Sequence, residues 1–90
     1  MKIKHKGLRA FARTGSARGI TAAQASKLAV MLADLAAATK PSELTGTGYR
    51  LHPLKGKLAG YWSIRITGNW RLIFRFVQGE AVGVDLIDYH

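Results

Sequence analysis

The segment between Tyr49 and Lys57 gathers side chains that can exchange a proton and bind a phosphate. Its guanidinium, imidazole and two ammonium groups belong to Arg50, His52, Lys55 and Lys57. Pro53 directs the preceding histidine towards an extended backbone, and Gly56 lets the chain turn sharply. An imidazole takes up or releases a proton near neutral pH, and cations beside it can hold a phosphate. A basic loop that is merely solvated is the alternative, and the segment alone does not decide between the two.

Further guanidinium groups follow on the strands predicted downstream. Side chains alternate between the two faces of a strand, so Arg71 and Arg75 share one face. Arg50 and Arg65 are candidates for the same side. Each guanidinium can hold phosphate oxygens through paired, charge-assisted hydrogen bonds. This sheet face is therefore a candidate phosphate-binding surface, and a polar face in water is the alternative.

Asp88, Tyr89 and His90 close the sequence, directly after a predicted apolar strand. A tyrosine ring can stack on a nucleobase, and a histidine can exchange protons near neutral pH. Terminal residues are often frayed, so this signal is weak by itself.

Metal and cofactor sites are not predicted. No two of the three histidines have helical i, i+4 spacing, and few carboxylates lie near them. The chain has no cysteine, which excludes thiolate metal sites and disulfides. The glycines between Gly46 and Gly60 lack the Gly-Lys-Ser/Thr ending of a phosphate loop, and no nucleophile-elbow motif occurs. We therefore expect no metal and no cofactor.

The charge balance predicts a polyanionic partner. Lys and Arg number 14 against 5 Asp and Glu, for a formal net charge of +9. No acidic residue precedes Asp34, and the stretch from Pro41 to Gly79 contains only Glu43. Such an excess favours nucleic acid through phosphate contacts and counterion release. A membrane partner is not expected because no basic amphipathic helix with an aromatic face is evident. No signal peptide is recognisable, so a cytoplasmic location is expected.

Two helices are predicted in the first half of the chain. Leu8, Phe11 and Ala12 recur at helical spacing and indicate a first helix. Thr21 to Gln24 is typical of a capping box that begins a second helix, and Pro41 ends it. The apolar stripe of the second helix is Leu28, Met31, Leu32 and Leu35. Both helices are expected to serve packing rather than to carry a site.

Strand-forming residues dominate the second half. Segments 61–66, 70–77 and 81–87 are rich in β-branched and aromatic residues, and short turns containing glycine separate them. Lys2 to His5 alternates in polarity and predicts another short strand. Strands joined by short turns are antiparallel. The sequence therefore predicts an α+β fold, a single domain over residues 1–90 with two N-terminal helices packed on one face of an antiparallel sheet.

Four sequence blocks in the second half follow one another in a recognisable order. They are Tyr49-Arg50-Leu51-His52-Pro53-Leu54-Lys55-Gly56, Gly60-Tyr61-Trp62-Ser63-Ile64, Asn69-Trp70-Arg71 and Asp88-Tyr89-His90. These blocks, with the opening segment from Ile3 to Leu8, resemble the HigB toxins, the plasmid-maintenance killer branch of the RelE/ParE superfamily. The resemblance covers nearly the whole chain and implies a RelE-like fold with a basic concave face.

The resemblance also implies an activity. It points to the toxin of a type II toxin–antitoxin system, a ribosome-dependent mRNA endoribonuclease that works without a metal in the ribosomal A site and inhibits translation and growth. The implied partners are mRNA, the ribosome with its ribosomal RNA, and a cognate helix-turn-helix antitoxin of the HigA type. Operator DNA would be reached only through that antitoxin.

The family's catalytic positions correspond here to His52, Lys55, Arg71, Asp88, Tyr89 and His90. The remaining basic candidates, which we expect to bind RNA phosphates, are Arg50, Lys57, Arg65 and Arg75. The stretch from Lys57 to Ala59 lacks the acidic residues that some members carry there, which leaves codon preference and antitoxin pairing open.

Two other functions stay open at this point. ParE relatives share the fold and poison DNA gyrase, but they lack the catalytic His, Lys and Tyr set that the resemblance implies here. A non-catalytic RNA-binding module would need the basic sheet face but not His52, Lys55 or His90. Alanine substitutions at those three positions would leave the binding by such a module intact.

Overall fold

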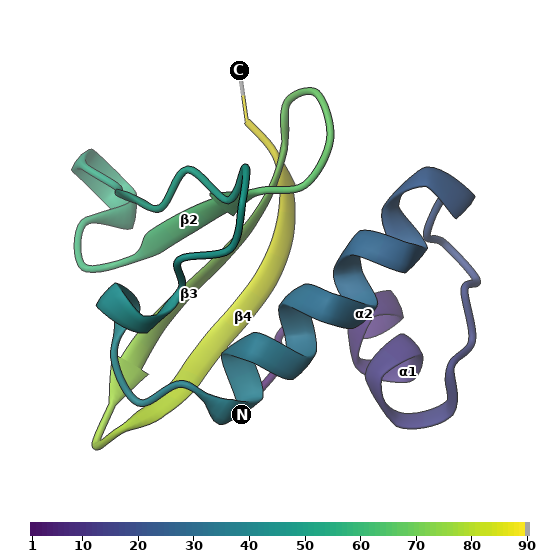
Figure 1. Ribbon diagram of the computed structural model, residues 1–90, viewed down its shortest axis with the longest axis horizontal. Coiled ribbons are helices and arrows are strands. Elements are labelled where there is room, and N and C mark those ends of the chain that lie inside the picture. Colours follow the sequence, from purple (N-terminus) through teal and green to yellow (C-terminus); the bar gives the residue numbers. More distant parts are fainter. Residues whose placement is uncertain (90) are drawn as a thin grey trace.

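Two helices form one layer of the molecule and a four-stranded antiparallel sheet forms the other (Figure 1). The computed structural model describes residues 1–89, so the predicted role of His90 lies outside the described residues. The helical segments are α1 (Lys6–Thr14), α2 (Ala22–Ala37) and the short 3-10 turns η1 (Pro41–Glu43) and η2 (Gly56–Leu58). The strands, in their spatial order, are β1 (His52–Pro53), β2 (Trp62–Arg65), β3 (Trp70–Val77) and β4 (Glu80–Asp88). The predicted α+β architecture is confirmed.

Side chains cap both long helices at their N-termini. The Thr21 hydroxyl accepts a hydrogen bond from the Gln24 backbone N–H at 3.2 Å, and Gln24 Oε1 accepts one from the Thr21 N–H at 3.4 Å. This is the predicted capping box of α2. At the start of α1, His5 Nδ1 accepts a hydrogen bond from the Leu8 N–H at 2.9 Å. Gly15 ends α1 in the left-handed conformation that favours glycine.

Consecutive strands pair antiparallel, and the predicted segments match β2, β3 and β4 to within two residues at each end. The predicted strand from Lys2 to His5 is shorter than expected, because only Ile3 forms a bridge, parallel to Val84. The Lys4 N–H donates to the Val84 carbonyl at 2.7 Å, and the Val84 N–H donates to the Lys2 carbonyl at 3.1 Å. The N-terminal segment thereby covers the free edge of β4.

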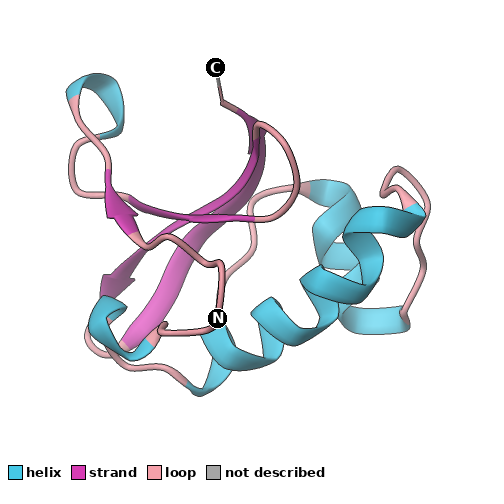
Figure 2. Cartoon of the chain, turned by 45° about the horizontal axis from the view of Figure 1, so that its top comes forward, coloured by secondary structure: helices cyan, strands magenta, loops and turns pink. Residues whose placement is uncertain are grey.

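The sheet face that is turned towards α1 and α2, called here the inner face, holds the hydrophobic core. Ile64, Leu72 and Phe74 have no exposed surface and belong to one cluster with the stripe of α2. The stripe is the predicted one, Leu28, Met31, Leu32 and Leu35. Figure 2 shows the sheet curving, with both helices on one side of it. Within residues 1–89 no helix is long and apolar enough to cross a membrane.

Strand β4 departs from regular pairing at Gly83. Ile73 pairs with Asp85 and Arg75 pairs with Val82, so β4 has one more residue than β3 between these two pairs. Gly83 has a φ of +61°, which suits glycine and is typical of a β-bulge. Because the bulge absorbs one residue, Val82 and Asp85 lie on the same face although three positions separate them.

Candidate functional site

The other face of the sheet, called here the outer face, collects side chains from all four strands. Residues opposite each other in the register share a face. The middle row consists of His52, Ser63, Ile73 and Asp85. The turn row, beside the β2–β3 turn, consists of Arg65, Arg71 and Ile87. The far row contains Arg75 and Val82. Neighbouring rows are about 6.6 Å apart, since each residue advances about 3.3 Å along a strand.

The two guanidinium groups of the turn row are held by the turn itself. The Gly68 carbonyl accepts hydrogen bonds from Arg71 Nη1 at 3.0 Å and from Arg65 Nε at 3.4 Å. Arg71 Nη1 also donates to the Trp70 carbonyl at 3.2 Å. Among residues 1–89, no carboxylate forms an ion pair with either guanidinium. Neutral carbonyls therefore orient both groups, and their positive charge stays available to an anion.

His52 lies in the middle row on the edge strand, with its ring exposed. Its Nδ1 atom lies 3.0 Å from the Pro53 carbonyl oxygen. In the neutral tautomer that protonates Nδ1, this contact is a hydrogen bond to the carbonyl and Nε2 keeps a lone pair. The Cα atoms of His52 and Arg71 are two strands and one row apart, about 12 Å by standard sheet spacings. Both side chains are long enough to reach a single nucleotide between them.

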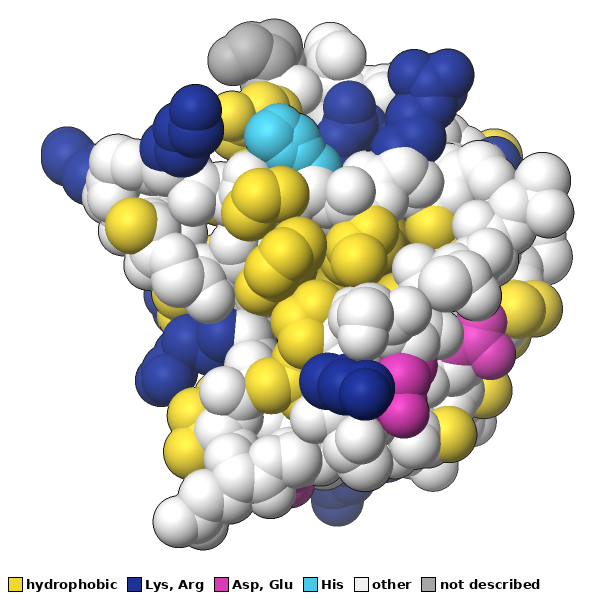
Figure 3. Space-filling model, turned by 60° about the vertical axis from the view of Figure 1, so that its left-hand side comes forward, with side chains coloured by type: hydrophobic (Ala, Val, Ile, Leu, Met, Phe, Trp, Pro, Cys, Tyr) yellow, Lys and Arg dark blue, Asp and Glu magenta, His cyan; other side chains and the backbone are white. Residues whose placement is uncertain are grey.

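Lys55 and Lys57 stand at the loop that joins β1 to β2. Lys55 directly precedes η2, Lys57 lies within it, and both side chains are exposed. The backbone of this loop is fixed, because the Leu54 N–H donates to the Tyr61 carbonyl at 2.9 Å and the Tyr61 N–H donates to the Leu58 carbonyl at 3.0 Å. Figure 3 looks onto this side of the molecule and shows Lys and Arg side chains around a band of hydrophobic ones.

Arg50 lies beside the turn row. Its backbone is left-handed, with a φ of +50°, which is uncommon for a residue other than glycine. Arg50 and Arg65 line one open cavity of ≈ 340 Å³ together with Lys27, whose Nζ donates to the Ile66 carbonyl at 3.0 Å. The predicted grouping of Arg50 with Arg65 thus occurs, with a lysine from α2 added to it.

The last described residues leave the sheet beside Arg71. Asp88 pairs with Trp70, one position beyond the Arg71 pair with Ile87. By strand alternation, the Asp88 side chain therefore points to the side of Trp70 rather than to that of Arg71. Tyr89, two positions after Ile87, returns to the outer side, and its N–H donates to the Asn69 carbonyl at 2.8 Å. The Tyr89 ring is 48% exposed, so it is accessible to a ligand.

Three residues of the outer side are absent from the sequence-based set. Ile3 packs against the core beside Val84, so Lys2 and Lys4 point to the opposite side by alternation. The polarity pattern at the N-terminus contains this signal, but the pairing with β4 is needed to place it. Tyr61 lies with its ring centroid 5.9 Å from the guanidinium carbon of Arg75. Nothing in the local sequence indicates that contact.

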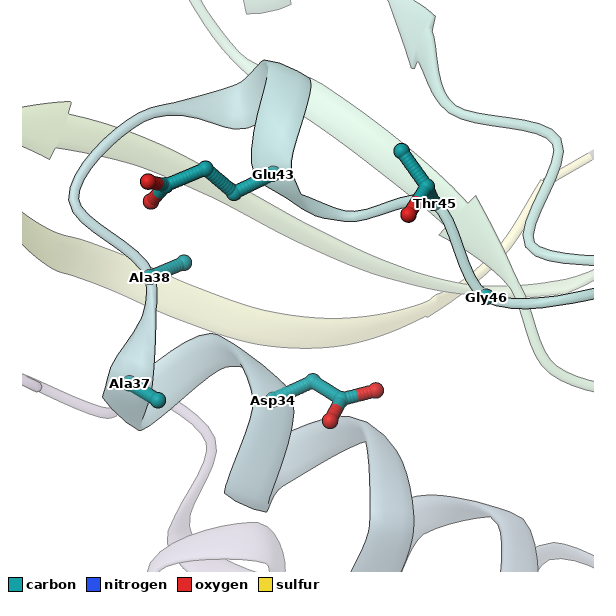
Figure 4. Close-up of a pocket in the computed structure, with 6 residues that line it drawn as sticks. All are labelled: Asp34, Ala37, Ala38, Glu43, Thr45 and Gly46. Carbon is teal, nitrogen blue, oxygen red and sulfur yellow. The ribbon is translucent and has the colours of Figure 1, made fainter.

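Acidic side chains gather elsewhere, between the end of α2 and η1 (Figure 4). Asp34 and Glu43 line a cavity of ≈ 420 Å³ there. The Tyr49 hydroxyl donates to Asp34 at 2.5 Å, and the Thr39 N–H donates to Glu43 at 2.6 Å. The Thr39 backbone hydrogen bond lowers the pKa of Glu43, while burial and the Asp34 bond raise the pKa of Tyr49 to about 12. These carboxylates tie the loop to α2, whereas Asp85 lies in the middle row of the outer face, where the cations outnumber it.

Comparison with known proteins shows which family the chain resembles. Residues 1–90 match the family described as the RelE-like toxin of the type II toxin–antitoxin system HigB. Endoribonuclease HigB of Proteus vulgaris is 40% identical over 88 residues, which cover 98% of this chain and 96% of that relative.

Proposed function

Because the chain belongs to the HigB-like family of RelE-type toxins of type II toxin–antitoxin systems, we propose that it is an endoribonuclease that cleaves mRNA on the ribosome. The resemblance noted in the sequence is thereby confirmed at the level of the family. The observation that carries the proposed activity is the outer face. There His52, Arg65 and Arg71 lie together on one side of the sheet, and within residues 1–89 no carboxylate neutralises the two arginines.

RNA supplies its own nucleophile, the ribose 2′-hydroxyl. In the proposed reaction Nε2 of His52 takes the 2′-hydroxyl proton, and Nδ1 donates its own proton to the Pro53 carbonyl. The 2′-oxygen bonds to the adjacent phosphorus, and the bond from phosphorus to the 5′-oxygen breaks. The leaving 5′-oxygen receives a proton from Lys55 or His90. The products are a 2′,3′-cyclic phosphate and a 5′-hydroxyl end.

Arg71 stabilises the additional negative charge that develops on the phosphoryl oxygens. Its guanidinium is held in place by two backbone carbonyls before any substrate binds, so little reorganisation is needed. Tyr89 stacks on the nucleotide beside the cleaved bond, and Asp88 orients His90. Arg50, Lys57, Arg65 and Arg75 bind neighbouring phosphates.

The proposed reaction uses no metal ion. Within residues 1–89, no group of three His, Asp or Glu side chains is placed to hold a metal ion. Proton transfer by an imidazole and charge stabilisation by guanidinium groups supply what a metal hydroxide would supply elsewhere.

The ribosome is the proposed site of action. A chain with a net charge of +9 is attracted to ribosomal RNA, and docking there brings the outer face to mRNA. Free RNA is expected to be cut weakly, since docking on ribosomal RNA is what brings the message to the outer face. A type II toxin has a cognate antitoxin. We place the whole domain, residues 1–90, in the cytoplasm and assign the antitoxin to the helix-turn-helix HigA type, which alone brings the pair to operator DNA.

Mapping of RNA ends tests this function. After induced expression in bacteria, primer extension should find mRNA cuts inside translated codons, together with growth arrest, and Arg71→Ala should abolish both. The new 5′ ends should be hydroxyls, which kinase treatment makes ligatable. Ends that already carry a 5′-phosphate would contradict the metal-free reaction, and DNA breaks without mRNA cuts would contradict the ribonuclease assignment altogether.

A further inference from the structure

We propose that Tyr61 is an RNA-binding residue whose ring stacks on an unpaired nucleobase, while Arg75 binds a phosphate of the same nucleotide. The site would lie in the far row, one row beyond His52 and two rows beyond Arg71 on the outer face. The site extends the proposed RNA-binding surface along the strands, from the turn row and the middle row to the far row. The proposal rests on the proposed function, since the nucleotide belongs to the RNA that the outer face binds.

The register places Tyr61 on the outer face. Trp62 pairs with Phe74, and the next position along the strands sets Tyr61 against Arg75. The ring centroid of Tyr61 is 5.9 Å from the Arg75 guanidinium carbon, within the range of a cation–π contact. Arg75 is exposed, and among residues 1–89 no carboxylate pairs with it. A ring and an unpaired cation thus lie side by side on a surface open to solvent.

The bulge in β4 makes room for the Tyr61 ring. A Cβ atom at Gly83 would lie 2.8 Å from the Tyr61 hydroxyl oxygen, closer than real contacts allow. The Tyr61 side chain, which starts beside β2, therefore crosses β3 and ends against the backbone of β4. Glycine at position 83 satisfies both the φ of +61° and this approach.

The backbone that carries the ring is held before any ligand binds. Backbone hydrogen bonds fix Tyr61 from both sides, through its carbonyl to Leu54 at 2.9 Å and through its N–H to Leu58 at 3.0 Å. The side chain is nevertheless only half-buried, so part of the ring surface is accessible. A fixed and accessible aromatic ring beside a phosphate-binding cation is the arrangement by which proteins bind single-stranded RNA bases.

A binding titration with abasic RNA tests the proposal directly. Short single-stranded RNAs, each lacking the base at one position, are titrated by fluorescence anisotropy at low salt against wild type, Tyr61→Leu and Tyr61→Phe. Phe11→Leu is the matched control, because it removes a partly buried ring from the helix layer. Thermal unfolding of each variant shows that it is folded.

Tyr61→Leu should weaken binding of intact RNA about tenfold, and Tyr61→Phe and Phe11→Leu should stay within about twofold of wild type. For wild type, one abasic position should cost about the same tenfold, and for Tyr61→Leu that position should cost nothing further. Equal affinities of wild type and Tyr61→Leu for intact RNA would overturn the proposal. It would also be overturned if the abasic position weakened RNA binding by Tyr61→Leu as much as binding by wild type. Because the readout is binding, this result is independent of whether the protein cleaves RNA.

Cleavage in programmed ribosomes then identifies the source of the base. If the base belongs to mRNA, an abasic nucleotide in the message should raise the half-saturating toxin concentration for wild type and not for Tyr61→Leu. If it belongs to ribosomal RNA, Tyr61→Leu should weaken ribosome binding equally with intact and abasic messages. Either result supports stacking by Tyr61, and a Tyr61→Leu variant with wild-type half-saturation on both messages would contradict it.

Discussion

The inner and outer faces of the sheet are built by alternate residues of the same strands, yet they differ in almost every contact. On the inner face Leu72 and Phe74 are completely buried in one cluster with α2. On the outer face their neighbours Arg71 and Arg75 are half-buried and exposed, and within residues 1–89 neither is paired with a carboxylate. The inner face supplies the free energy of folding, which leaves the outer face free to carry unneutralised charge.

This separation explains how a chain of 90 residues can hold a site of like charges. Three arginines on one face repel one another, and a small domain has little stability to lose. The repulsion is limited because the Gly68 carbonyl is shared by Arg65 and Arg71 while the strands below are fixed by the core. Substitutions on the outer face should therefore change activity, and substitutions on the inner face should change stability.

The largest separation should come from substituting the same side chain, histidine, once on the outer face and once in the helix layer. His52→Ala should lower the rate of mRNA cleavage at least about 100-fold, the usual cost of losing a general base, with little change in stability. His5→Ala removes the same ring from the helix layer, where it caps α1, and should leave the rate unchanged while costing about 1 kcal/mol in the free energy of unfolding. Single-turnover cleavage and urea denaturation measure the two quantities. Equal cleavage rates for the two variants would contradict the assignment of His52 as the general base.

Leu72→Ala should show the converse effect. Truncation of a fully buried leucine leaves a cavity in the core and should lower the free energy of unfolding by about 2–5 kcal/mol. At a temperature where the variant is still folded, its cleavage rate should stay close to that of wild type, although position 72 is adjacent to Arg71. Urea denaturation followed by tryptophan fluorescence gives the stability. A wild-type midpoint would mean that the inner face is not the core.

The inner side also contains a group that should respond to alkaline pH. The pKa of Tyr49 is about 12 rather than 10, so the neutral phenol is favoured in the folded state. That contribution is complete below pH 10 and is lost as pH rises through about 12, at no more than about 1.4 kcal/mol per pH unit. Lysines titrate in the same range, so the measured quantity is the difference in stability between wild type and Tyr49→Phe. A difference that does not shrink between pH 10 and 12 would contradict the assignment.

The smallest effect should come from the helix cap. Thr21→Ala removes the hydroxyl that accepts from Gln24 and should cost about 1 kcal/mol of stability without changing cleavage. Thr21→Ser keeps the hydroxyl and serves as the control. A loss of activity in Thr21→Ala at full stability would contradict the separation of stability from activity.

The fold could be predicted because its signals are local. The capping box at Thr21 and the apolar stripe of α2 each lie within a few residues, and both are observed. Alternation in β3 is observed at Leu72, Phe74 and Arg75, but Ile73 is buried as well although it belongs to the outer face. The same alternation placed Arg71 and Arg75 on one face. The assignment of catalytic roles to these residues remains a prediction.

The rest depends on contacts between distant segments. The pairing of Ile3 with Val84, which carries Lys2 and Lys4 to the outer side, is not visible in either segment alone. The bulge at Gly83 changes which residues of β4 face outward, and so the contact between Tyr61 and β4 could not be anticipated. Asp88 falls on the side of Trp70 for the same reason, because register, not composition, sets the face of a strand residue.

The most direct test of the outer face as the RNA-cleaving surface is the mRNA cleavage rate of purified protein on programmed ribosomes, measured for two arginine variants. Arg71→Ala and Arg13→Ala remove the same charge, one from the outer face and one from the last turn of α1. Arg71→Ala should lower the rate about 100-fold or more, and Arg13→Ala should stay within about twofold of wild type. Equal rates for the two variants, with both folded, would contradict this assignment of the outer face.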